Sequence, residues 1–244
     1  MTHLTPGPDD RYLILAPHPD DEALSAGGVI QEALAVGARV RVVYLTLGEA
    51  NGRRETRKRE AIGVMGFLGL SEDDLSFLGY RDRGLMQIWK KRARCPENEA
   101  VRLLTDLERC LDLYRPTHIF CPSSFDTHPD HRAACLFLMA VMEKRGLGEE
   151  VHPHVYLYVI HRLPWLGRFF SGPDQRQRLD FQLTEEQAEK KRKTILFYKS
   201  QTASRNNFLL SFAGQIERFE ALSYSFSEPA NSVVCLDYRS SNNP

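Results

Sequence analysis

The sequence predicts a Rossmann-like, three-layer α/β/α fold with a mostly parallel sheet. Strand-like and helix-like segments alternate along the chain, which favours parallel strands with helices on both faces. The chain has 244 residues, of which 42% are hydrophobic, and this is sufficient for a substantial core. No internal repeat, low-complexity tract or long linker marks a boundary, so we expect residues 1–244 to form one domain.

The first predicted unit is a βαβ unit. Residues 11–16 and 40–46 are short runs rich in Val, Ile, Leu and Tyr, the composition of buried central strands. Between them, residues 22–36 carry apolar side chains at helical spacing, and Gly37 follows as a stop signal. We therefore expect a crossover helix that joins two parallel strands.

The remaining elements continue the alternation. The sequence TEEQ at 184–187 is a capping box and marks the start of one helix. Two long irregular stretches, residues 81–96 and 161–177, are candidates for loops over a site. Helices are expected at 56–70, 97–114, 130–144, 184–200 and 208–222, and strands at 75–78, 118–122, 155–160, 179–183 and 233–236.

Composition argues against several classes of protein. Lys+Arg and Asp+Glu balance at 32 each, so no global field recruits nucleic acid or an anionic membrane. The longest apolar stretch, Ala133–Met142, is far shorter than the roughly 20 residues of a membrane-spanning helix. The polar N-terminus lacks the pattern of a secretory signal, so we expect a cytoplasmic protein. The five cysteines include no C-x-x-C pair, which argues against a disulfide framework and a thiolate zinc site.

Two His-Pro-Asp segments, each following a predicted strand, carry the functional signal. Residues 18–22 (HPDDE) follow the first strand, and residues 128–131 (HPDH) follow the strand at 118–122. If these strands are parallel and adjacent, both segments lie at the carboxyl edge of the sheet, where open α/β folds bind ligands. One such segment alone is typical of a turn whose aspartate caps the next helix. Two of them indicate a metal site, because turn chemistry does not require histidine twice.

The residue types in these segments suit hydrolytic zinc chemistry. Neutral imidazoles together with a carboxylate bind zinc, and a catalytic zinc site keeps one position open for water. Zinc brings the pKa of that water down to about 7, and a remaining carboxylate can serve as general base. This set of groups predicts the hydrolysis of an amide or an ester.

Residues 16–22 (APHPDDE) and 126–131 (DTHPDH) resemble the LmbE-like, PIG-L-type family of zinc-dependent N-acetylglucosaminyl deacetylases. The similarity covers most of the chain in the family's order and includes residues 46–49, 57–61, 78–82 and 193–201. The resemblance implies the removal of an N-acetyl group from an N-acetylglucosamine-type amino sugar or glycoconjugate by attack of a zinc-bound water.

The resemblance implies that His18, Asp21 and His131 bind the zinc and that Asp20 is the general base. Adjacent carboxylates suit this division, since one can turn to the metal while the other faces the water. A His₂Asp ligand set also accepts iron(II) or cobalt(II), because affinity alone does not select among these metals.

The resemblance further implies that His128, oriented by Asp130, stabilises the tetrahedral oxyanion or protonates the leaving amine. Some family members carry a tyrosine two residues before the first histidine of this motif, where the present chain has Asp126. We expect Asp126 to brace the loop or a neighbouring ligand, which places more of the oxyanion role on His128.

Substrate contacts are implied for Arg57 and Asp82, which resemble sugar-binding positions of the family. Each has a competing interpretation. Arg57 belongs to a basic run, residues 53–59, that is typical of a solvated helix face, and Asp82 can cap a turn. His161 ends the strand predicted at 155–160, and either a substrate contact, support of a metal ligand or a purely structural role remains open for it.

The expected function is therefore that of a zinc-dependent N-deacetylase. The alternatives are an amidase acting on a larger sugar conjugate and a sugar-binding protein of the same fold without turnover. A dinucleotide oxidoreductase is excluded because HPDDE follows the first strand in place of a G-x-G-x-x-G sequence. No nucleic-acid partner is expected unless the separate basic runs share one face. The apolar residues of 161–177 suit a substrate lid, a satellite core or a homo-oligomer contact.

Overall fold

A computed structural model describes residues 4–49, 52–92, 98–145, 152–161 and 177–222. Its strands are β1 (Arg11–Ala16), β2 (Arg39–Thr46), β3 (Leu75–Tyr80), β4 (His118–Pro122), β5 (His154–Tyr158), β6 (Gln177–Gln182) and β7 (Ile216–Leu222). Its helices are α1 (Asp21–Ala35), α2 (Arg54–Leu68), α3 (Leu85–Lys91), α4 (Glu99–Tyr114), α5 (Pro129–Arg145), α6 (Glu185–Phe197) and α7 (Lys199–Leu210), with a short 3₁₀ turn at Glu72–Asp74.

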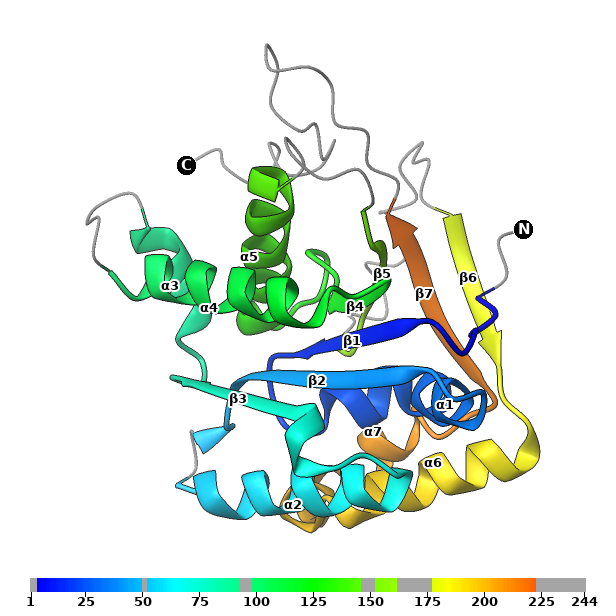
Figure 1. The fold of residues 1–244 in the computed structure, drawn as a ribbon. Helices are drawn as coiled ribbons and strands as arrows, with labels where there is room; N and C mark the ends of the chain where they lie inside the picture. Colours follow the sequence, from blue (N-terminus) through cyan, green and yellow to red (C-terminus); the bar gives the residue numbers. More distant parts are fainter. Residues whose placement is uncertain (1–3, 50–51, 93–97, 146–151, 162–176, 223–244) are drawn as a thin grey trace.

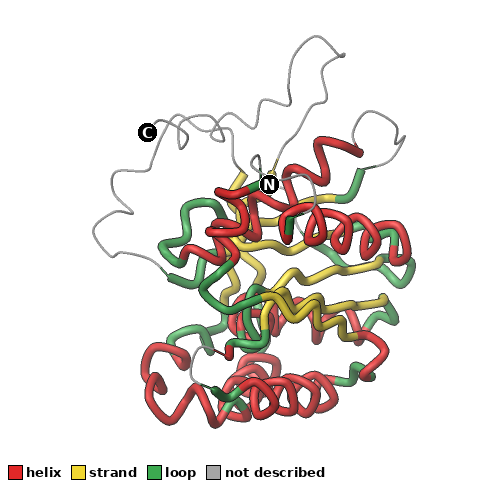
Figure 2. The backbone as a smooth tube through the Cα atoms, turned by 90° about the vertical axis from the view of Figure 1, so that its left-hand side faces the viewer, coloured by secondary structure: helices red, strands yellow, loops and turns green. Residues whose placement is uncertain are grey.

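The strands form one mixed sheet between two helical layers, which confirms the predicted three-layer fold (Figure 1). The strand order is β3-β2-β1-β4-β5-β7-β6; β7 pairs antiparallel with both β5 and β6, and the other described pairs are parallel. Helices α1, α2, α6 and α7 cover one face, and α3, α4 and α5 cover the other; Figure 2 shows the sheet enclosed between the two layers.

Strand β1 illustrates why the central strands read as continuous apolar runs. Its side chains point alternately to the two faces of the sheet, and both faces are covered by helices. Tyr12 and Ile14 join the apolar cluster on the α1 side, whereas Leu13 and Leu15 join the cluster on the α5 side. All of these side chains are buried, so no polar residue is tolerated in the run.

The adjacency of β1 and β4 positions the site. The two strands pair in parallel with Tyr12 opposite His118 and Ile14 opposite Phe120. Their carboxyl ends therefore lie at the same edge of the sheet, and β1 leads into α1 as β4 leads toward α5. The topological condition under which the two His-Pro-Asp segments meet is thus confirmed.

Two expectations about the secondary structure are wrong. Helix α7 ends at Leu210, and residues 216–222, predicted as helix, form strand β7. Ile216, Phe219 and Leu222 are spaced like one helical face, but in the strand Glu217 and Phe219 point inward while Ile216 is exposed. The stretch 81–96 also contains helix α3 in its described part. The strand expected at 233–236 and residues 162–176 lie outside the described residues.

A buried carboxylate from β7 supports a kink in α1. Ala26 has non-helical dihedral angles, which breaks the helical hydrogen-bond ladder and frees the N–H groups that follow. The N–H groups of Gly28 and Val29 donate to Glu217 at 2.6 and 3.0 Å, and the ammonium of Lys191 donates to the same carboxylate at 2.7 Å. Glu217 therefore acts as the anion at the start of the second segment of α1.

None of the helices in the described part of the chain has the length and apolar character needed to span a membrane.

Candidate metal centre and active site

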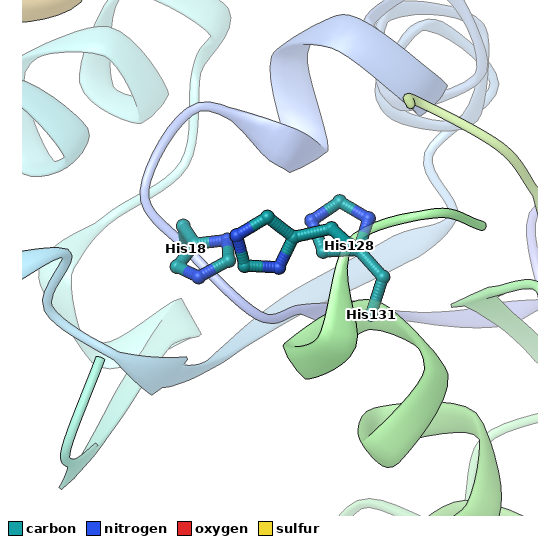
Figure 3. A group of neighbouring side chains, drawn as sticks. All are labelled: His18, His128 and His131. Atoms are coloured by element: carbon teal, nitrogen blue, oxygen red, sulfur yellow. The ribbon is translucent and has the colours of Figure 1, made fainter. Parts of the chain in front are cut away.

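Three histidines from the two segments converge above the carboxyl ends of β1 and β4 (Figure 3). His18 follows β1, whereas His128 and His131 lie just before and within the first turn of α5. The ring centroids of His18 and His128 are 4.7 Å apart, and those of His18 and His131 are 5.4 Å apart. One ring nitrogen of each histidine lies within 4.8 Å of the others, which is close enough for a single cation.

The carboxylate of Asp21 lies between two of these rings. Its Oδ2 is 3.3 Å from Nδ1 of His18 and 3.2 Å from Nε2 of His131. The Nε2 atom of His131 is buried and makes no well-formed hydrogen bond within the described part of the chain. A buried ring nitrogen without a bond is costly, and a metal ion satisfies it. His18, Asp21 and His131 thus have donor types that suit a divalent metal, and Asp21 contacts both imidazoles, whereas the three ring nitrogens that lie within 4.8 Å of one another belong to His18, His128 and His131.

The charges of this donor set shift the pKa values of Asp21 and His131 in opposite directions. Burial alone raises the pKa of Asp21, but His131 and His18 outweigh burial and hold that pKa well below its usual range. Burial lowers the pKa of His131, whereas Asp21 and Asp126 overcompensate and raise it to about 9. Because a ligating imidazole must be neutral, a metal ion held by His131 would displace a proton.

Asp126 holds His131 from the side away from Asp21. Its Oδ2 lies 3.0 Å from Nδ1 of His131 and accepts the N–H groups of Ile160 and His161 at 2.9 and 3.1 Å. Its Oδ1 accepts the N–H of His128 at 2.8 Å. Asp126 is expected from the sequence to brace the loop or a neighbouring ligand, and in the structure it contacts both the loop backbone and the ring of His131. A carboxylate bonded to the second nitrogen fixes the tautomer and direction of a metal-binding imidazole.

Asp82 and Asp130 meet the second nitrogen of His18. Nε2 of His18 is 3.2 Å from Oδ1 of Asp82 and 3.3 Å from Oδ2 of Asp130. The Asp130 carboxylate also accepts the N–H groups of Arg83 and Leu85 at 2.6 and 3.0 Å. Its contact to His128 runs through the backbone, because the Asp130 N–H donates to Nδ1 of His128 at 3.2 Å. The Asp130 carboxylate, expected to orient His128, therefore faces His18 in this structure.

An aspartate that directly precedes a helix usually caps it, but the side chain of Asp20 does not. Asp20 precedes α1, yet its side chain makes no capping hydrogen bond. Its Oδ1 lies 3.2 Å from Nη2 of Arg57, which also donates to the carbonyl of Pro19. Burial raises the pKa of Asp20 to about 6, against the opposing effect of Arg57. A carboxylate with such a pKa is suited to accept a proton near neutral pH.

A cavity of about 950 Å³ opens over these groups. Helix α7 forms part of its wall, and His161 stacks on Phe208 of that helix with ring centroids 5.5 Å apart. The His161 ring is also 5.3 Å from that of His128, so the structure brings His161 into the site. The α7 wall was missed in the sequence, because the helices expected at 184–200 and 208–222 left residues 201–207 as a break. The cavity is lined by His18, Asp20, Asp21, Leu24, Gly48, Arg57, Asp82, Arg83, His128, Pro129, Ile160, His161, Gln201, Thr202, Ala203, Ser204, Asn207, Phe208 and Leu209.

Residues 13–142 match the PIG-L family, described as GlcNAc-PI de-N-acetylase. The chain belongs to this family. The match contains both His-Pro-Asp segments and most of the parallel half of the sheet. Family membership thus confirms the resemblance that the two segments indicated.

Curated relatives are similar over part of their length. A 1D-myo-inositol 2-acetamido-2-deoxy-alpha-D-glucopyranoside deacetylase from Mycobacteroides abscessus is 32% identical over 158 residues, covering 55% of this chain and 56% of the relative. A probable N-acetyl-alpha-D-glucosaminyl L-malate deacetylase 2 from Bacillus cereus is 32% identical over 136 residues, covering 50% and 56%. The chain thus matches little more than half the length of these relatives.

A solved structure extends the similarity across the fold. The conserved protein TT1542 from Thermus thermophilus superposes with a TM-score of 0.61 at 26% identity, covering 90% of this chain and 98% of that one. Because it covers 90% of this chain, the superposition extends beyond residues 13–142 of the family match.

Replacing Asp126 with asparagine is expected to weaken metal binding by about 10- to 100-fold. The amide keeps the size of the side chain but removes the charge that orients and polarises His131. Competition titration of zinc against a chromophoric chelator measures the change. Asp106→Asn is the matched control, since Asp106 lies on α4 and accepts from Tyr80 away from the donor set. Unchanged zinc affinity in Asp126→Asn would remove His131 from the ligand set.

Proposed function

We propose that this protein is a metal-dependent hydrolase that removes the N-acetyl group from an N-acetylglucosamine-type amino sugar or glycoconjugate. The observation that carries the proposal is the convergence of His18, Asp21 and His131 beside a separate buried carboxylate, Asp20, at one cavity. Both curated relatives described above are named as deacetylases of glucosaminyl conjugates, which supports the choice of substrate class.

Zinc held by His18, Asp21 and His131 would supply Lewis acidity and a water of lowered pKa. The carboxylate of Asp20 accepts one proton from the attacking water as the new C–O bond forms. The same proton then passes from Asp20 to the amide nitrogen, so that the C–N bond breaks with loss of a neutral amine. Arg57 holds Asp20 through its contact to Oδ1.

His128 is suited to stabilise the oxyanion as a hydrogen-bond donor. Burial, together with the neighbouring His18 and His131, lowers its pKa to about 4, so the ring is neutral at pH 7. Because Nδ1 accepts the N–H of Asp130, the neutral ring carries its proton on Nε2. This N–H can donate to the carbonyl oxygen as negative charge develops there. We therefore favour an oxyanion role for His128 over protonation of the leaving amine.

Arg57 and Asp82 line the same cavity and are proposed to contact the sugar. In this structure their charged ends also touch the catalytic groups, Arg57 at Asp20 and Asp82 at His18. A substrate hydroxyl that bonds to either side chain is therefore placed directly against the reacting centre. This arrangement supports a role in orienting the amide as well as in binding the sugar.

Amine release from a panel of N-acetylglucosamine conjugates tests the proposal. The panel includes inositol- and malate-linked sugars, with N-acetyl amino acids as amides that lack a sugar. We expect zinc-loaded protein to release amine from at least one sugar, chelation to abolish release, and added zinc to restore it. Sugar binding without release, with stoichiometric metal bound, would identify a binding protein instead. Release only from amides that lack the sugar would move the activity to another amidase.

A further inference from the structure

Asp20 has a backbone conformation that its neighbours must hold in place. Its φ of 129° and ψ of −27° lie in a region that residues other than glycine rarely adopt. Such conformations persist only where the surrounding structure enforces them, and they gather at functional sites. At Asp20 this conformation accompanies a side chain that is free of capping and lines the cavity. The groups that fix the backbone of Asp20 therefore fix the direction of its carboxylate.

Glu22 makes the contact that fixes this backbone. Its Oε2 accepts the N–H of Asp20 at 3.1 Å, and the carbonyl of Asp20 accepts the N–H of Leu24 at 3.0 Å. Both peptide groups that flank the strained residue are thus hydrogen bonded. The side chain of Glu22 is fully buried and does not line the cavity, so it cannot exchange a proton with the substrate. Its effect on the reaction must pass through Asp20.

Tyr198 holds Glu22 in turn. The hydroxyl of Tyr198 donates to Oε1 of Glu22, so both carboxyl oxygens of Glu22 are engaged. Tyr198 is itself buried and sits at the junction between α6 and α7. Helix α7 carries Asn207 and Phe208 into the wall of the cavity. The Glu22 carboxyl thus links the loop that contains Asp20 to the start of α7, the helix that forms part of the cavity wall.

We propose that Glu22 and Tyr198 are positioning residues for Asp20 and that they set its carboxylate for proton transfer. This inference rests on the proposed function, in which Asp20 is the general base. It predicts that loss of either group lowers kcat more than it alters KM or metal affinity, because the metal ligands and the α7 wall stay in place.

Tyr198→Phe is the most direct test, because it removes one oxygen and keeps the ring. Tyr12→Phe is the matched control, since Tyr12 is also buried and its hydroxyl donates to Asp10 at 3.3 Å. Tyr12 lies in β1 on the amino-terminal side of the strand's centre, away from the cavity lining. We expect Tyr198→Phe to lower kcat between about 10- and 100-fold and to leave the zinc dissociation constant unchanged. Tyr12→Phe is expected to leave kcat at the wild-type value.

Amide hydrogen exchange of Asp20 gives a readout that needs no substrate. We expect exchange at this N–H to accelerate by roughly tenfold in Tyr198→Phe, since Glu22 is then free to move, and to be unchanged in Tyr12→Phe. Accelerated exchange would uphold the positioning role even if no amide were hydrolysed. Unchanged exchange would overturn it, whatever the activity.

Glu22→Gln and Glu22→Ala form a second pair that keeps the inference testable if Tyr198→Phe does not fold. The glutamine side chain retains an oxygen for the Asp20 N–H and can donate its amide to the Tyr198 oxygen, whereas alanine retains neither contact. We expect kcat of Glu22→Gln to exceed that of Glu22→Ala by roughly tenfold. Equal kcat values in the two variants would contradict a positioning role.

Discussion

Replacing Asp20 with asparagine is expected to lower kcat by about 10²- to 10⁴-fold while the bound zinc remains stoichiometric. The amide matches the carboxylate in size and keeps an oxygen for Arg57, but it cannot accept the proton of the attacking water. The proposed ligands, His18, Asp21 and His131, are untouched. Initial rates of amine release at saturating substrate, with zinc quantified in the same samples, measure the effect.

Asp112→Asn serves as the control for this substitution. Asp112 lies on α4, where its exposed carboxylate pairs with Arg145, and neither residue lines the cavity. We expect the control to retain wild-type kcat and zinc content. An Asp20→Asn variant that keeps kcat within a factor of about three would assign the base to another residue. A variant that loses zinc together with activity would instead place Asp20 among the ligands.

The part of the fold that can be predicted from the sequence is the part in which local pattern and burial agree. Strands β1 and β4 are covered on both faces, and their continuous apolar runs identify them with the correct bounds. Thr184 and Gln187 make the reciprocal bonds of the capping box that the sequence indicates at the start of α6. Parallel pairing of β1 with β4 is then sufficient to predict that the two His-Pro-Asp segments lie close together.

The partners of individual site residues are less predictable, because they depend on side-chain direction. Sequence spacing places Asp130 two residues after His128, which suggests that they interact. In the structure the backbone of Asp130 contacts His128, while its carboxylate turns to His18 and the loop that contains Arg83. The position of His161 after β5 is the main sequence feature that connects it with the site. In the structure its N–H donates to the carboxylate of Asp126, which holds it at the site.

Strand β7 is not predicted from the sequence, because a buried charged residue interrupts the alternation of apolar and polar residues that indicates a strand. An antiparallel strand with one buried face normally alternates apolar and polar residues. In β7 the inward positions are occupied by Glu217 and Phe219, and Ile216 is outward, so the apolar residues fall at helical spacing. The charge at position 217 is explained only by tertiary contacts with Lys191 and with the kinked helix α1.

Lys191→Met is expected to lower the free energy of unfolding by about 3–5 kcal/mol. The side chain of Lys191 is 1% exposed and that of Glu217 is fully buried, so methionine would leave a carboxylate buried without its cation. The remaining donors, the N–H groups of Gly28 and Val29, carry only partial charge. Urea unfolding followed by circular dichroism measures the difference, with the slope of the transition used to check that both proteins unfold in one step.

Lys144→Met isolates the contribution of burial in this prediction. Lys144 also lies 2.7 Å from a glutamate, Glu108, but its side chain is 72% exposed. Because an exposed pair is screened by water, we expect the control to change stability by less than about 1 kcal/mol. Adding Glu217→Gln to Lys191→Met removes the unpaired charge and keeps an acceptor for α1, so the double variant is expected to be more stable than Lys191→Met alone. If the double variant were the less stable of the two, the cost would come from the support of α1 by Glu217 rather than from its uncompensated charge.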